Sequence, residues 1–162
     1  MTISNTKKMN VLNVADYFIY LSNQNKKVIT NKKLQKLVYY AQAWSLVLNN
    51  KKLFNDKIEA WVHGPAVRSL YVQYKNFGFN PIKKDIDIET IQISEKDKNI
   101  INEVWKVYGK FDSRYLEMLT HSEGPWQDAR NNVQSYENSE NEITTKSMKS
   151  FYSKKLEEVR SE

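Results

Sequence analysis

Two histidines, His63 and His121, are the only imidazoles in the sequence, and each lies one to three residues before a Gly-Pro pair. A metal or acid–base site would require them to converge with carboxylates such as Glu59 or Glu123. Two imidazoles are too few to indicate a metal cluster. We therefore predict no metal site, and we expect each imidazole to stabilise a tight turn by hydrogen bonding to the backbone.

Other residue types that carry chemistry are scarce. The chain has no cysteine, which excludes disulfides, thiolate nucleophiles and Cys-ligated metals. It has 4 glycines and no glycine-rich phosphate loop, and neither the G-x-S-x-G nor the H-E-x-x-H pattern occurs. Ser45, Ser69 and Ser122 have no base at a recognised spacing. We predict that the protein is not an enzyme and binds no cofactor.

Aromatic and arginine side chains gather around the two Gly-Pro pairs. Tryptophan, tyrosine and arginine favour protein interfaces when they are partly exposed, whereas plain core packing explains most aromatics in any chain. The predicted structural turns are Gly64, Pro65, Gly124 and Pro125. The candidate partner-binding residues beside them are Trp61, His63, Arg68, Tyr71, His121, Trp126 and Arg130.

The element that must position these turns is a helix predicted over residues 30–49. Its apolar residues recur at i, i+3, i+4 and i+7, and a second apolar row lies on another side, so we expect neighbours on more than one face. Thr30 or Asn31 can cap its first turn. Large side chains predicted to enter the core are Leu34, Leu37, Tyr40, Trp44 and Leu48.

The remaining elements follow from local patterns. Residues 57–62 alternate as in a short strand, and one or two edge strands within 85–93 are predicted to pair with it. Residues 131–142 are polar and predicted to form a mobile loop. Further helices are predicted at 10–23, 65–76 with Pro65 at the first helical position, 94–108, 113–120 with Ser113 as the cap, 125–130, and from Thr144 or Thr145 onward.

These elements predict a mainly α fold. We expect a compact single-domain helical bundle of about six helices with at most a small two- or three-stranded β element. The predicted domain spans residues 10–160 and follows a flexible tail at 1–9. The N-terminus lacks the apolar core of a secretion signal, and no stretch is apolar for the length of a bilayer. A cytoplasmic protein without a membrane partner is the resulting expectation.

Charge is distributed unevenly along the chain. Residues 1–84 hold 14 Lys/Arg and 3 Asp/Glu, whereas residues 85–162 hold 11 and 16. A basic half can contact nucleic acid or an acidic protein, but charge runs are most often solvated surface. Because no homeodomain, zinc-finger or RNA-recognition pattern occurs, nucleic acid is possible as a partner but is not the favoured one.

Several blocks together resemble the SocA/GepA-type domain, also called the Panacea antitoxin domain. The blocks are KLQKLVYYAQAW (33–44), LF (53–54), IEAWVHGPAV (58–67), LYVQYKNFG (70–78) and LEMLTHSEGPWQDAR (116–130). The resemblance spans about residues 10–155. Ala66 departs from the valine that the family usually has after Gly-Pro, which is a change in packing.

The resemblance implies a helix-dominated domain that serves as the antitoxin of a toxin–antitoxin pair, often carried by phages or mobile elements. Its implied partner is a cognate toxin protein, neutralised by direct binding or, as in one member, by delivery to a ClpXP-type protease. No catalytic residue is implied. Two alternatives remain open: a phage protein that inhibits a host defence protein, and a nucleic-acid-binding regulator that uses the basic half.

Overall fold

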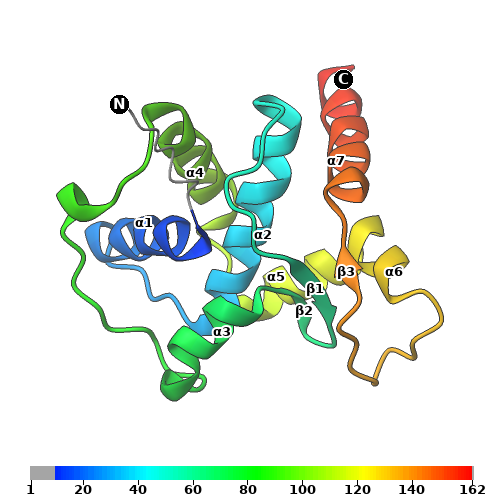
Figure 1. The fold of residues 1–162 in the computed structure, drawn as a ribbon, viewed down its shortest axis with the longest axis horizontal. Coiled ribbons are helices and arrows are strands. Elements are labelled where there is room, and N and C mark those ends of the chain that lie inside the picture. Colours follow the sequence, from blue (N-terminus) through cyan, green and yellow to red (C-terminus); the bar gives the residue numbers. More distant parts are fainter. Residues whose placement is uncertain (1–9, 162) are drawn as a thin grey trace, which may run out of the picture.

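Helix α2 (Asn31–Leu48) runs through the middle of the molecule in the computed structural model, which describes residues 10–161 (Figure 1). Thr30 is the N-cap, and its hydroxyl accepts a hydrogen bond from the Lys33 amide at 3.1 Å. The predicted central helix is confirmed with its cap, because Thr30 satisfies one of the amides that the first turn leaves unpaired.

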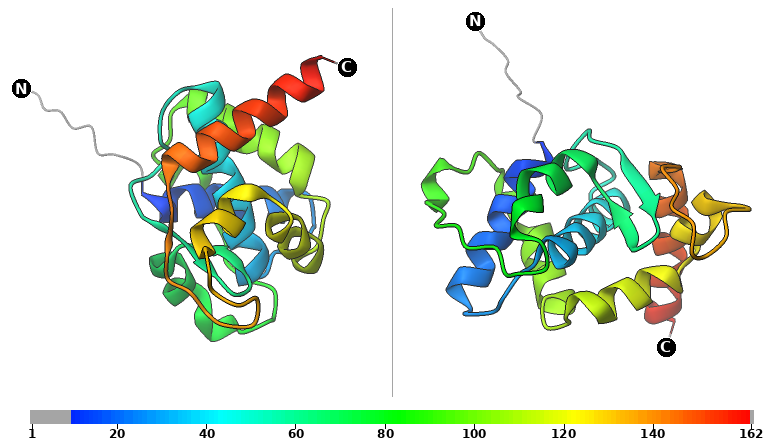
Figure 2. Two further views of the ribbon diagram at one scale, coloured as in Figure 1. Left: turned by 90° about the vertical axis from the view of Figure 1, so that its right-hand side faces the viewer. Right: turned by 90° about the horizontal axis from the view of Figure 1, so that it is seen from below.

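Six further α-helices surround α2 within the described residues. Helices α6 and α7 lie at one end of the molecule and α1 at the other, and α2 packs directly against α1, α3, α4, α5 and α7 (Figures 1 and 2). The six helices are α1 (Val11–Gln24), α3 (Arg68–Tyr74), α4 (Glu95–Tyr108), α5 (Ser113–His121), α6 (Gly124–Arg130) and α7 (Thr145–Arg160).

The predicted caps account for most helix starts. Asn10, Ser94 and Thr144 each accept a hydrogen bond from the amide three residues onward, as the sequence indicated. Helix α5 differs by one residue, because the Asp112 carboxylate caps it at 2.8 Å and Ser113 is its first helical residue. Aspartate takes this position readily, since its charge also complements the helix dipole.

A three-stranded antiparallel sheet, in the order β2-β1-β3, lies beside α2. Strand β1 (Ile58–Trp61) was predicted, but its partners were not: they are β2 (Gly64–Ala66) and β3 (Glu142–Ile143). The predicted edge strands within 85–93 were wrong, because that segment contains only a 3₁₀ turn at Ile88–Thr90. Pairing instead places Ile143, 1% exposed, opposite Ile58 in the core.

Pro65 was predicted to begin a helix and instead lies in β2, opposite Ala60. The chain stays extended through Val67 before α3 begins at Arg68. An edge strand tolerates proline because the missing N–H faces away from the sheet. Pro125, in contrast, lies in the first turn of α6 as predicted.

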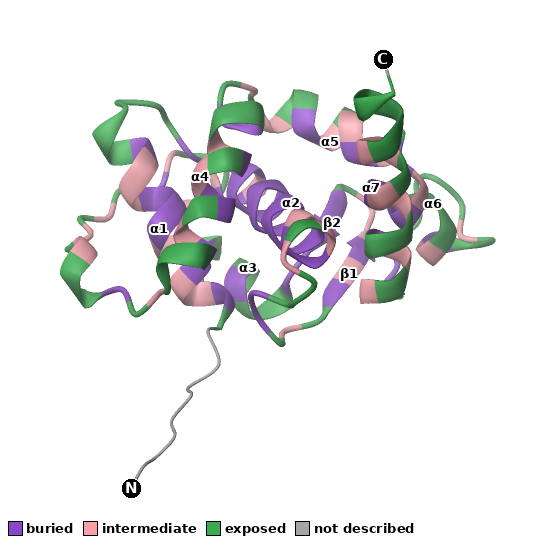
Figure 3. Ribbon diagram, turned by 90° about the horizontal axis from the view of Figure 1, so that it is seen from above, coloured by how far each residue is buried: buried purple, intermediate pink, exposed green. Residues whose placement is uncertain are grey.

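One contiguous core cluster includes side chains from α1 through α7, and α2 is its most buried element (Figure 3). Leu34, Leu37 and Tyr40 are fully buried, as predicted, and Trp44 is partly buried. Leu48 was predicted to be buried but is 47% exposed, because the last turn of α2 lies at the rim of an apolar groove shared with α4. The tail predicted at 1–9 lies outside the described residues.

We propose that residues 10–160 form a single domain, because this one core cluster joins the first helix to the last. The fold class is confirmed as mainly α with a small sheet.

Gln42 offers a direct test of how α2 holds its neighbours. Its amide donates to the Phe54 carbonyl at 2.8 Å and accepts from the Leu53 amide at 2.7 Å, all within the buried interior. We predict that Gln42→Met lowers the free energy of unfolding by about 2–5 kcal/mol, because the Phe54 carbonyl and the amides of Leu53 and Phe54 lose their side-chain partner. Urea denaturation measures the loss. Gln92→Met, at an exposed position, is the control and should change stability little.

Candidate partner-binding site

Three of the predicted partner-binding side chains form one cluster on β1 and α3. The Trp61 indole N–H donates to Glu59 at 2.7 Å, the Arg68 guanidinium lies 5.2 Å from the Trp61 ring, and the Tyr71 ring meets that indole edge-to-face at 5.2 Å. Trp61 is partly buried, whereas Arg68 and Tyr71 are exposed. The structure therefore brings these three side chains together, and their contact with a partner stays a prediction.

The charge of Arg68 is already shared with two carboxylates. Its guanidinium donates to Glu59 at 3.0 Å and to Glu140 at 2.7 Å, and these bonds raise the pKa of Arg68. Glu140 comes from the segment before β3, so Arg68 ties α3 to that segment. The cluster therefore presents aromatic surface with a largely neutralised cation at its edge.

His63 lies at the tip of the β1–β2 turn and is exposed. Its Nδ1 atom faces a Glu117 carboxylate oxygen across 3.5 Å, and Lys32 pairs with the other oxygen. Burial favours the neutral acid, but Lys32 and His63 together hold the pKa of Glu117 below its usual value. The turn is thus connected to α5 by charge.

The second predicted corner, around α6, is built differently. The His121 and Trp126 rings stack at 3.9 Å, and both Trp126 and Arg130 reach back to β1. The Trp126 indole donates to the Trp61 carbonyl at 2.8 Å, and the Arg130 guanidinium donates to the Ala60 carbonyl at 3.0 Å. Burial lowers the pKa of His121, so its neutral form is favoured.

Burial separates the two corners in role. Trp126 is 7% exposed and Arg130 is 3% exposed, and their polar groups are occupied inside the molecule. A partner could not reach them in this structure, so we assign both side chains to supporting β1 from behind. Partner contact stays a prediction for Trp61, His63, Arg68 and Tyr71, and in part for His121, which is partly buried.

A cavity of about 470 Å³ opens beside the exposed cluster, between the first half of α2, the β1–β2 turn and α3. Its walls include the rings of Trp61 and Tyr71, and the nearly fully exposed Phe79 stands at its rim. Other lining residues are Asn31, Lys32, Gln35, Lys36, His63, Gly64, Ala66, Lys75 and Gly78.

Lys36 lines this cavity, although its sequence pattern did not mark it as a candidate site residue. Its side chain is 2% exposed, and its ammonium donates to the Pro65 carbonyl at 3.2 Å. A Cβ atom at Gly64 would meet the Lys36 Cε at 2.5 Å, and Gly64 has a φ of +109°. Glycine at this turn is therefore required both by backbone conformation and by the lysine beside it.

The surroundings of Lys36 penalise its charge. Burial and, to a lesser extent, the neighbouring charge of Lys32 lower the pKa of Lys36 to about 7, against the opposing effect of Glu117. The available signal in the sequence was position: Lys36 lies on a helix that carries apolar rows on more than one side, so some of its polar residues have to face inward.

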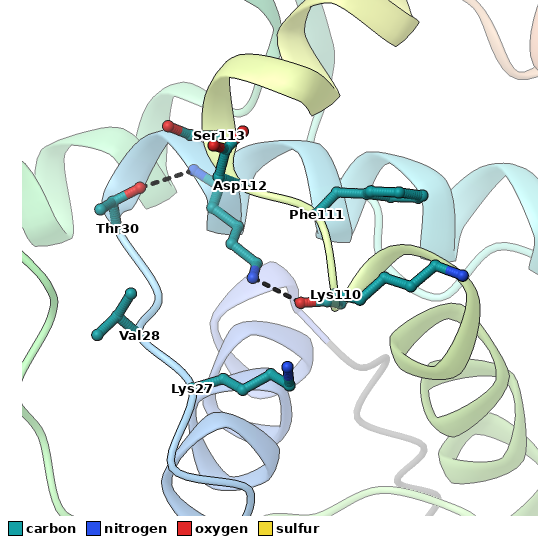
Figure 4. Close-up of a pocket in the computed structure, with 9 residues that line it drawn as sticks. Lys27, Val28, Thr30, Lys110, Phe111, Asp112 and Ser113 are labelled. Atoms are coloured by element: carbon teal, nitrogen blue, oxygen red, sulfur yellow. Dashed lines mark hydrogen bonds between the residues drawn. The ribbon is translucent and has the colours of Figure 1, made fainter.

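A second cavity, of about 270 Å³, provides a useful comparison (Figure 4). Figure 4 shows Lys27 before α2 and Lys110 after α4 on either side of it. Lys33, also buried, donates to the Gly109 carbonyl there at 2.6 Å and lies 5.6 Å from the Trp105 ring. Lys33 therefore has a short hydrogen bond and an aromatic face, whereas Lys36 has a single longer bond.

Residues 10–161 contain no group of three His, Cys, Asp or Glu side chains that could hold a metal ion. None of the helices in that range combines the length and the apolar character needed to cross a membrane.

Comparison with known proteins gives a family match. Residues 34–127 match the family model described as antitoxin SocA-like, Panacea domain, a range that runs from α2 through the cavity and most of α6. Antitoxin SocA of Caulobacter vibrioides (strain NA1000 / CB15N) is 34% identical over 112 residues, which cover 60% of this chain and 58% of that protein. The match thus spans less than two thirds of that relative. No solved structure matches the chain.

The burial of Lys36 predicts a pH dependence of stability. Native Lys36 releases its proton near a pH of about 7, whereas the unfolded side chain keeps it to 10.5. Between these values the unfolded state binds more protons, so stability rises with pH. We predict that the parent gains about 2–3 kcal/mol of stability between about pH 6 and about pH 9 that Lys36→Met does not gain. The free energy of unfolding of Lys36→Met minus that of the parent should therefore fall by this amount over the same range.

Urea denaturation of both proteins across this pH range measures the difference, because groups that titrate alike in the two proteins cancel. A difference that is flat with pH would show that Lys36 keeps an ordinary pKa.

The supporting role of Arg130 gives a second prediction. Its guanidinium donates to the carbonyls of Ala60, Gln134 and Glu137. We predict that Arg130→Met lowers the free energy of unfolding by about 3–5 kcal/mol, because these carbonyls lose a charged donor. Arg114→Met, at an exposed position, is the matched control. A loss below about 1 kcal/mol would contradict the assignment of Arg130 to structural support.

Proposed function

The chain belongs to the SocA-like antitoxin family defined by the Panacea domain, and from this premise we propose that it neutralises a cognate toxin protein by binding it directly. The resemblance drawn from the sequence blocks is confirmed by the family match. The observation that carries the proposed mechanism is the aromatic cluster of Trp61 and Tyr71, with Arg68 beside it, at the mouth of the cavity.

Surface chemistry supports a protein partner. Exposed aromatic rings held rigid by neighbours lose little conformational entropy when they bind, which is why such residues dominate binding energies at protein interfaces. The Trp61 ring is fixed by its bond to Glu59 and by its contact with Tyr71. A partner that covers these rings and excludes water would gain most of its affinity here.

The nucleic-acid alternative is weaker because much of the basic half is not free to act. Lys33 and Lys36 are buried, Lys32 pairs with Glu117, and Lys84 pairs with Asp16 at 3.0 Å. A binding surface for phosphates needs exposed cations gathered on one face. Delivery of a bound toxin to a ClpXP-type protease, and inhibition of a host defence protein, remain alternative outcomes of the same binding surface.

Co-expression with the product of the adjacent gene tests the proposal in the cytoplasm, where we expect both proteins to act. Expression of that gene alone should arrest growth, and this chain should restore growth and co-purify with its product. A harmless neighbour, or rescue without a complex, would refute neutralisation by binding. Rescue that depends on the protease would indicate delivery, and capture of a host protein instead would indicate the defence alternative.

The contact surface is tested by substitution. We predict that Trp61→Ala and Tyr71→Ala each weaken the complex by about 1–2 kcal/mol or more, which calorimetry measures as a roughly fivefold to thirtyfold or larger rise in Kd. Tyr115→Ala is the control, because Tyr115 is equally exposed and stacks on Phe111 at 4.2 Å, outside the cavity. Unchanged affinity in the Trp61 and Tyr71 variants would place the contact elsewhere.

A salt titration of the complex separates the two partner classes. An apolar protein interface should lose little affinity as salt rises, whereas phosphate binding falls steeply.

A further inference from the structure

We propose that the cavity beside Gly64 receives the carboxylate side chain of an Asp or Glu from the partner protein, and that the Lys36 ammonium binds it. The identity of the partner rests on the proposed function, but the chemistry of the cavity does not. The inference names the kind of group that a partner would insert, and it assigns Lys36 a binding role in addition to its contact with Pro65.

The Lys36 ammonium has more hydrogen-bond donors than the described part of the fold supplies with acceptors. A lysine ammonium carries three N–H donors, and the described residues provide this one with a single acceptor, the Pro65 carbonyl at 3.2 Å. The residue lines the cavity, and its Nζ lies close to Gly64, which lines it too. An acceptor that enters from the cavity would complete the coordination of the ammonium.

The side-chain amides that line the cavity, and Lys32, are already engaged with other groups of the chain. The Asn31 amide donates to the Tyr71 carbonyl at 3.2 Å, and the Gln35 amide both donates to Asn31 and accepts from the Val67 amide. Lys32 pairs with Glu117. Lys36 is thus a fully buried lysine of the cavity wall whose three donors exceed its one partner among the described residues, whereas Lys75 is exposed to solvent.

Charge supports the same assignment. The residues that line the cavity include three lysines, Lys32, Lys36 and Lys75, and no Asp or Glu. The titratable groups facing Lys36 from the packed elements are Lys32 on α2, Glu117 and His121 on α5, and His63 on the turn. Only Glu117 among these is acidic, and it already serves Lys32 and His63. An incoming anion would meet a net positive environment.

Carboxylate fits this cavity better than phosphate. Phosphate sites use several donors, often a planar arginine or a row of backbone amides, whereas this cavity offers one buried ammonium between aromatic walls. A cavity of about 470 Å³ also exceeds what a carboxylate alone would fill. The remaining space, walled by Trp61, Tyr71 and Ala66, suits apolar side chains on either side of the acid.

The state of the free protein agrees with this role. Burial lowers the pKa of Lys36 to about 7, so an entering carboxylate would restore the protonated form and raise that pKa again. Binding should therefore take up a proton near neutral pH, which is a signature that simple structural support would not produce.

The first experiment needs no partner. The full-length protein, labelled with ¹³C at the lysine Cε positions, is titrated with the capped tripeptides acetyl-Leu-Glu-Leu-amide and acetyl-Leu-Gln-Leu-amide, and with inorganic phosphate. The Lys36 signal is assigned by its loss in Lys36→Arg. We expect the Glu peptide to shift this signal and raise its titration midpoint, and the Gln peptide to leave both unchanged.

Three results would overturn the proposal. An equal response to the Glu and Gln peptides would show that Lys36 does not recognise the negative charge of the carboxylate. A response to phosphate alone would show a different anion site. The absence of any response at millimolar peptide would show that Lys36 only supports the turn.

The second experiment uses the complex with the adjacent gene product. We expect Lys36→Met to weaken that complex at least tenfold at neutral pH, with the parent fold retained by circular dichroism. Lys33→Met is the matched control, because Lys33 is buried on the same helix but lines the other cavity, and it should change affinity less than about twofold.

The proposed antitoxin function and the proposed carboxylate site can be refuted independently of each other. If the adjacent gene product does not bind at all, the proposed function fails while the peptide titration still decides the cavity. If the product binds and Lys36→Met and Lys33→Met behave alike, the carboxylate site is wrong and the antitoxin proposal stands.

Discussion

The constraint on which this structure depends is that α2 is buried along all but its last turn while carrying polar residues along most of its length. A buried polar group without a partner destabilises a fold by more than a typical hydrogen bond stabilises it, so each neighbour of α2 has to supply one. The contacts that result are Lys33 to Gly109, Gln35 to Val67, Lys36 to Pro65, Tyr40 to Glu123, and Gln42 to Leu53 and Phe54. Each of these contacts fixes a neighbouring segment of the chain against α2.

The β1–β2 hairpin is the segment most constrained by this arrangement. Helix α2 holds it from one side through Gln35 and Lys36, and α6 holds it from the other through Trp126 and Arg130. Because the backbone is fixed from both sides, the side chains that project from it are positioned before any partner arrives. A surface that is organised in advance loses less entropy on binding, so under the proposed binding role buried residues such as Trp126 would support a site that they do not touch.

The helices could be predicted from the sequence because their signals are local. Caps at Asn10, Thr30 and Ser94 and the apolar period of α2 involve residues within a few positions of one another. The sheet partners could not be predicted, since β3 is two residues in a polar loop and its pairing depends on Ile143 reaching the core. Pro65 was misassigned because proline suits both a first helical turn and an edge strand, and only the position of Ala60 opposite it decides between them.

The residue types of the candidate site could be predicted from the sequence, but the burial of each side chain could not. Tryptophan and arginine are enriched at interfaces, but their N–H groups also donate hydrogen bonds to buried backbone carbonyls. The sequence therefore could not distinguish Trp61 and Arg68 from Trp126 and Arg130. The reverse holds for lysine: because lysines usually lie on the surface, their residue type did not indicate that Lys33 and Lys36 are buried.

The difference between these two lysines is the most informative feature of the site. Burying an ammonium is unfavourable, and a methionine of similar length would fill the same space without that penalty. At Lys33 a 2.6 Å bond and the Trp105 ring offset part of the penalty within the fold itself, although burial still lowers the pKa of Lys33. At Lys36 a single 3.2 Å bond beside an open cavity offsets less of it. A buried ammonium so poorly compensated either releases its proton, as the lowered pKa of Lys36 indicates, or gains an acceptor from outside the chain. For a protein whose proposed role is to bind another protein, a carboxylate of the partner is the natural source of that acceptor.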